Sequence, residues 1–89
     1  MAETRYQRSP QAVWRASASF LVGAVPPQPP TRIAGSASVV WALLAQPRTV
    51  QEMVHELIAV ADAAPEQLHA DVEALFSQLV PLGLVEVVS

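Results

Sequence analysis

The sequence predicts an α+β protein in which three short strands precede three helices, an order that suggests a winged helix-turn-helix. Three observations predict this class. Residues 12–34 are rich in β-favouring side chains, whereas residues 36–80 carry apolar stripes with helical spacing. Thr49 is followed three residues later by Glu52, which is a capping box and marks the start of the middle helix.

The composition indicates one small domain and argues against several classes of function. Of the 89 residues, 52% are hydrophobic and 15% are charged, so some apolar surface is expected to stay exposed for a partner. The net charge is −3, and all five basic residues are arginine. This negative net charge disfavours binding to the phosphates of nucleic acids. Cysteine, a signal peptide and a membrane-spanning apolar run are all missing, so a cytoplasmic protein without disulfides is expected. Residues 1–11 are polar and are expected to form a flexible segment before a domain at residues 12–89.

The three strands are expected before residue 35. Residues 12–25 form two extended runs with a turn at residues 17–19, and Thr31–Ala34 forms a third. Between the second and third runs, Pro26–Pro30 holds four prolines in five residues, which excludes a helix or a central strand. A stiff loop between strands is favoured there over a proline-rich ligand for the aromatic groove of another protein.

The first two helices are expected to pack against each other, because only a short loop joins them. Gly35 or Ser36 caps the first helix, whose apolar stripe ends near Ala45. The second helix starts at Thr49 and its apolar stripe reaches Ala61.

The third helix is expected from Pro65 and Glu66, which suit a first helical turn through a fixed φ and a negative charge at the positive end of the dipole. Pro81 and Gly83 end it. The apolar run after Gly83 predicts either a last short strand or an apolar tail. The stripe of this helix comprises Leu68, Val72, Leu75, Phe76 and Leu79.

No constellation of residues supports catalysis, a metal site or a cofactor. His55-Glu56 begins like a zinc-protease motif, but Ala59 stands where the second histidine is required. His55 and His69 are both expected on solvated helix faces. Asp71 and Glu73 are too close along a helix to point the same way, so they do not form a catalytic carboxylate pair. The sequence therefore predicts a binding protein and not an enzyme.

Five segments together resemble the PqqD-like family, whose members are also described as recognition elements for the leaders of ribosomally made, post-translationally modified peptides. The resemblance covers residues 13–86, nearly the whole chain. The third helix and the entry to the second are its most telling parts. The segments are Ile33–Ala37, Val40–Leu44, Pro47–Val54, Ala70–Leu75 and Leu82–Glu86.

The resemblance implies a three-stranded antiparallel sheet packed on three helices, with a leader peptide added to the exposed edge of the third strand. Leader side chains would enter the groove between that strand and the third helix. Arg32 would pair with leader carboxylates, or would simply be a solvated strand residue. The implied peptide-binding residues are Thr31, Arg32, Ile33, Ala34, Leu68, Val72, Leu75 and Phe76.

The partners implied are a precursor peptide and a maturation enzyme, which would be a leader peptidase as in lasso-peptide biosynthesis or a radical SAM enzyme as in pyrroloquinoline quinone biosynthesis. The alternative is a winged-helix DNA-binding regulator or a protein–protein adaptor. DNA recognition by the third helix is disfavoured because Glu66, Asp71 and Glu73 lie on it without a single basic residue. The exposed edge of the third strand would also allow a homodimer.

Overall fold

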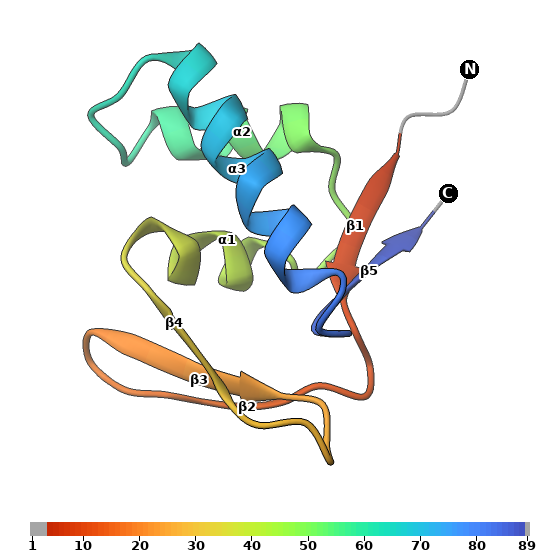
Figure 1. Cartoon of the computed structure of the whole chain (residues 1–89). Helices are drawn as coiled ribbons and strands as arrows, with labels where there is room; N and C mark the ends of the chain where they lie inside the picture. Colours follow the sequence, from red (N-terminus) through yellow and green to blue (C-terminus); the bar gives the residue numbers. More distant parts are fainter. Residues whose placement is uncertain (1–3, 89) are drawn as a thin grey trace.

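The computed structural model describes residues 4–88, and these form five strands and three helices (Figure 1). The sequence order of three strands followed by three helices is present, with one further strand at each end. The elements in chain order are β1 (Arg5–Arg8), β2 (Val13–Ala16), β3 (Phe20–Ala24), β4 (Thr31–Ala34), α1 (Ser36–Leu43), α2 (Val50–Ile58), α3 (Pro65–Leu79) and β5 (Val85–Val88).

The predicted three-stranded antiparallel sheet is confirmed, with the strand order β2-β3-β4. A turn joins β2 to β3, and the Ser17 amide donates to the Phe20 carbonyl across it at 2.8 Å. Alternation along the strands gives the sheet an inner face toward the helices and an outer face toward solvent. Leu21 and Ile33 are partners in the register and lie on the inner face, where only 4% and 3% of their surfaces are exposed.

The proline-rich segment is the connection between β3 and β4, as the loop interpretation predicted. Its chain turns where the Gln28 amide donates to the Val25 carbonyl at 3.0 Å. Pro26, Pro27, Pro29 and Pro30 are all exposed.

The capping box at the start of α2 is confirmed in both directions. The Glu52 amide donates to the Thr49 hydroxyl oxygen at 3.0 Å, and the Thr49 amide donates to the Glu52 carboxylate at 2.8 Å. Thr49 is itself buried, so these bonds satisfy polar groups that water does not reach. The same Glu52 carboxylate accepts from the Arg5 guanidinium at 2.8 Å, which ties β1 to this helix.

The other two helices begin where the sequence predicted. Gly35 is the residue before α1, and its φ of 65° lies in the left-handed region that glycine adopts most easily. Pro65 opens α3 and Glu66 lies in its first turn. Gly83, with φ 78°, follows α3 and turns the chain into β5.

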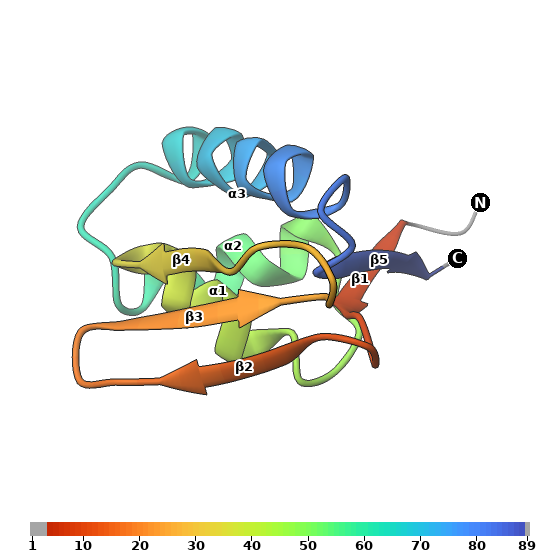
Figure 2. The ribbon, with the colours of Figure 1, turned by 60° about the horizontal axis from the view of Figure 1, so that its bottom comes forward.

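The hydrophobic core lies between the inner face of the sheet and the three helices (Figure 2). Trp41 of α1 is 1% exposed and meets the half-exposed Trp14 of β2 edge to face, with ring centroids 6.0 Å apart. Gly23 lies opposite Trp14 in the register, and a Cβ there would stand 3.4 Å from Leu84. A Cβ at this distance would make an ordinary van der Waals contact, so the Leu84 side chain packs against β3 at Gly23.

The expectation of a flexible segment at residues 1–11 is wrong for Arg5–Arg8, which form β1. Residues 1–3 lie outside the described part of the chain. β1 pairs antiparallel with β5, and the Tyr6 and Arg48 backbones exchange two hydrogen bonds of 2.8 and 2.9 Å. The Tyr6 ring also stacks on Phe76 of α3 at a centroid distance of 4.3 Å. These contacts come from distant parts of the sequence, so the polar composition of the segment does not reveal them.

Candidate peptide-binding groove

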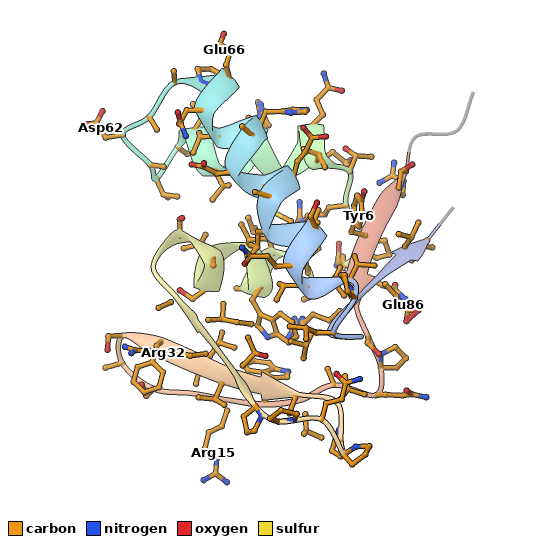
Figure 3. All side chains as sticks on the ribbon, in the orientation of Figure 1. Tyr6, Arg15, Arg32, Asp62, Glu66 and Glu86 are labelled. Carbon is orange, nitrogen blue, oxygen red and sulfur yellow. The ribbon has the colours of Figure 1, made fainter. Side chains whose placement is uncertain are left out.

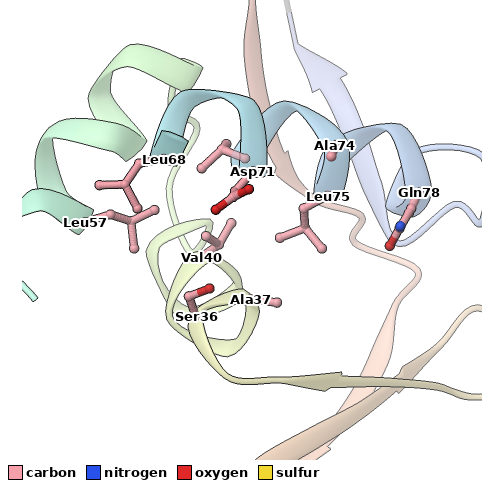
Figure 4. Close-up of a pocket in the computed structure, with 10 residues that line it drawn as sticks. Ser36, Ala37, Val40, Leu57, Leu68, Asp71, Ala74, Leu75 and Gln78 are labelled. Atoms are coloured by element: carbon pink, nitrogen blue, oxygen red, sulfur yellow. The ribbon is translucent and has the colours of Figure 1, made fainter. Parts of the chain in front are cut away.

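A groove of about 230 Å³ lies between α3 and the first turns of α1 (Figure 4). Its wall on the α3 side is one long helix face, and its floor is formed by α1 and by Leu57 of α2. Most of its lining is apolar, which suits burial of a partner's apolar side chain. The lining residues are Ser36, Ala37, Val40, Leu57, Leu68, Asp71, Val72, Ala74, Leu75 and Gln78.

The strand that leads into this groove is an edge strand. Within residues 4–88, β4 pairs with β3 alone, so the side of β4 away from β3 carries no ladder. α3 lies along that side of the sheet in Figure 2, and α1 follows β4 after a single residue, Gly35. An edge strand presents N–H and C=O groups that can pair with another extended chain. The free edge and the groove are therefore next to each other.

The four predicted residues of β4 divide between two faces of the sheet. Ile33 belongs to the core. Arg32 is exposed, and its guanidinium carbon lies 4.5 Å from the centre of the Phe20 ring, so its side chain occupies the outer face. Thr31 is half-buried and Ala34 is exposed. The structure thus places their backbones at the edge, while none of their side chains is part of the groove lining.

Three of the four predicted α3 residues line the groove. Leu68 and Val72 are 4% and 2% exposed and serve the core as well, whereas Leu75 is only partly buried. Phe76 is 3% exposed and stacks on Tyr6, and it is outside the groove lining. The helix stripe that the sequence left undivided therefore separates into core residues and a groove residue.

Sequence reasoning missed the polar and small residues of the groove. Asp71, Ala74 and Gln78 of α3 follow one another at i, i+3 and i+7, beside the apolar stripe. This helical spacing places the three residues on one side of the helix and could have identified them. They were missed because only large apolar residues were considered for the groove. On α1, Ser36 and Ala37 were also missed, and they are the first two residues after the Gly35 cap.

The histidines are outside the groove and lie on exposed helix faces, as expected. His69 Nδ1 is 3.1 Å from a Glu73 carboxylate oxygen, an i,i+4 pair at the surface of α3. Within residues 4–88, no group of three or more His, Asp or Glu side chains is arranged to hold a metal ion. In the same part of the chain, every helix is too short or too polar to cross a membrane.

The comparison with protein families bears on this groove. The family model for coenzyme PQQ synthesis protein D (PqqD) matches residues 31–85, more than half of the chain. The chain belongs to the PqqD family. Among curated proteins and solved structures, none matches the chain.

The part of the chain that matches the PqqD family contains the whole groove. The match begins at Thr31, the first residue of β4, and ends at Val85, the first residue of β5. Every residue that lines the groove falls between these limits, and so does the free edge strand. β1, β2 and β3 lie before the match, and they supply the pairing partner of β4 and the contacts that hold α3 in place.

Proposed function

We propose that this PqqD-family protein is a non-catalytic peptide-binding protein. It recognises the leader of a ribosomally synthesised precursor peptide and presents that peptide to a maturation enzyme. The observation that carries the proposal is the juxtaposition of an unpaired strand edge, β4, with an apolar groove against α3. Family membership supports the same class of function.

In the proposed complex the leader adds a strand to β4. Main-chain hydrogen bonds to β4 supply affinity without regard to sequence, and alternate side chains of the leader enter the groove and supply specificity. Leader side chains on the opposite face of the added strand lie on the side of Arg32, which is available to pair with a carboxylate. Thr31, Ile33 and Ala34 contribute through their backbones, and Phe76 contributes by holding α3 against Tyr6.

The proposed partner enzyme is a leader peptidase, as in lasso-peptide biosynthesis, or a radical SAM enzyme, as in pyrroloquinoline quinone biosynthesis. Either would act in the cytoplasm on a peptide delivered by this protein. The proposed binding domain comprises residues 12–89 together with β1, because β1 and β5 form one ladder. A homodimer formed through the same β4 edge would compete with the leader.

The proposal is tested by fluorescence polarisation of labelled leader peptides that are encoded beside the gene for this protein. Ala74 lines the groove and Ala70 does not, although both are exposed residues of α3. The variant Ala74→Trp fills the groove and is expected to weaken leader binding by about tenfold or more. The matched variant Ala70→Trp is expected to bind like the unaltered protein.

Circular dichroism establishes that both variants are folded. A folded protein that binds none of the leaders would refute the proposal. Equal leader binding by the two variants would refute the placement of the leader in this groove.

A further inference from the structure

Asp71 is the one acidic residue that lines the groove (Figure 4). Its carboxylate lies between α3 and α1, beside Val40. One of its oxygens, Oδ1, accepts a hydrogen bond from the Gln67 amide nitrogen at 2.9 Å. Within residues 4–88, no arginine or histidine forms an ion pair with this carboxylate. A negative charge therefore faces the space that a bound peptide would occupy.

The arginines of the described chain do not offset this charge. Arg5 and Arg48 pair with glutamates of α2, and Arg8 lies over the rings of two tryptophans at 5.0 and 5.7 Å. Arg15 and Arg32 lie on the outer face of the sheet, where Figure 3 shows the Arg15 side chain pointing away from the helices. α3 itself has no lysine or arginine. Asp71 is therefore the one charged side chain in the lining of the groove.

The spacing along α3 matches the spacing along a strand. Asp71 and Leu75 both line the groove and are four residues apart, which is a rise of about 6 Å along a helix. Residues i and i+2 of an extended chain are about 6.6 Å apart and point to the same face. The axes of β4 and α3 are roughly parallel in Figures 1 and 2, although the chain runs along them in opposite senses, so a strand added to β4 would run along α3. Two alternate side chains of that strand would then meet Asp71 and Leu75.

We infer that the peptide bound by this protein carries a lysine or arginine two residues from an apolar side chain, with the cation at Asp71 and the apolar group at Leu75. This inference rests on the proposed function and adds the chemical class of peptide that the groove selects. Asp71 is exposed at the groove and forms no ion pair with a described residue, so a cation is attracted and an acidic side chain is repelled. Apolar lining around Leu75 provides the second contact.

The test is selection of a displayed library of random peptides on the full chain, followed by binding measurements on single peptides. Selected peptides are expected to share a basic residue and an apolar residue separated by one position. Replacement of that basic residue by glutamate is expected to weaken binding about threefold to tenfold at low salt, and added salt should reduce the difference.

Three variants locate the effect, two at Asp71 and one at Glu73. Asp71→Lys is expected to reverse the preference toward acidic peptides, and Asp71→Asn is expected to abolish the preference without altering the size of the side chain. Glu73→Lys changes the net charge by the same amount on the same helix but lies outside this groove, so the basic preference should persist.

The outcomes separate this inference from the proposed function. Peptides that bind without a basic preference, or with one that Asp71→Lys leaves unchanged, would overturn the inference and leave peptide binding intact. A folded protein that selects no peptide at all would overturn both.

Discussion

Glu52 connects the start of α2 to β1. Its carboxylate closes the capping box at Thr49 and also accepts from Arg5 of β1. The Thr49 amide that donates to it, with the charge of Arg5 in addition, holds the pKa of Glu52 below its ordinary value. Because the folded state favours the ionised form, this residue links stability to pH.

We predict that Glu52→Gln removes part of the acid sensitivity of the fold. A lowered pKa contributes stability that is fully present above the pKa of the unfolded chain and is lost as pH falls through the lower folded value. The unaltered protein should therefore exceed Glu52→Gln in urea-unfolding midpoint at neutral pH, and the difference should shrink in acid. Glu66→Gln, a glutamate outside any capping box, is the control. A difference that stays constant with pH would contradict the prediction.

Burial decides which predicted site residues are accessible to a peptide. The side chains of Val72 and Ile33 are only 2% and 3% exposed. A charged residue at either position would be buried in the core and would destabilise the fold. Leu75 and Ala74 face the groove without full burial. Substitutions that test binding therefore belong at these two positions.

At the scale of elements, β1 is the part of the fold that sequence reasoning did not anticipate. It has four residues, two of them arginine, and its partner strand is at the other end of the chain. Its ladder with β5 brings Tyr6 against Phe76. β1 thereby fixes the far side of the same helix that forms the wall of the groove.

We predict that Tyr6→Ala destabilises the protein by about 2 kcal/mol, because the stacked ring pair is lost and Phe76 loses its cover. Tyr6→Phe keeps the ring and should remain close to the unaltered protein. Denaturant unfolding followed by circular dichroism measures both. If Tyr6→Ala unfolds at the same midpoint as Tyr6→Phe, β1 does not support α3.

At the scale of the whole molecule, the charges are divided between the two layers. Glutamates and aspartates gather on α2, α3 and the loop between them, while Arg15 and Arg32 lie on the outer face of the sheet. Figure 3 shows Glu66 and Asp62 at the end of the helical layer that is far from Arg15. A helix that enters the major groove of DNA would have to bring this acidic surface to the phosphates.

We therefore predict that the protein does not bind duplex DNA. A gel-shift or polarisation assay at low salt should give a dissociation constant weaker than about 10⁻⁴ M, outside the usual range of non-specific binding. Circular dichroism of the same preparation shows that the protein is folded. Tight binding that weakens steeply with added salt would instead support the alternative function of a DNA-binding regulator.

Local physics explains why so much of the fold could be predicted from the sequence. The Thr49–Glu52 box, the Gly35 cap, Pro65 in the first turn of α3 and the loop at Pro26–Pro30 all depend on residues close along the chain. Secondary-structure propensity, helix capping and the helical period of apolar residues act over a few residues. The order of strands and helices could therefore be predicted from the sequence. The family resemblance added the sheet pairing. It placed the groove between the third strand and the third helix, whereas the groove of the structure is lined by α3, α1 and Leu57 of α2.

Only the tertiary structure decided the features that need distant residues to meet. The ladder between β1 and β5, the stacking of Tyr6 on Phe76, and the division of the α3 stripe into core and groove all depend on packing between separate elements. One face of a helix shows the same apolar period whether a neighbour covers it or not. Which residues of α3 remain open was therefore fixed by where α1, α2 and β1 pack against it.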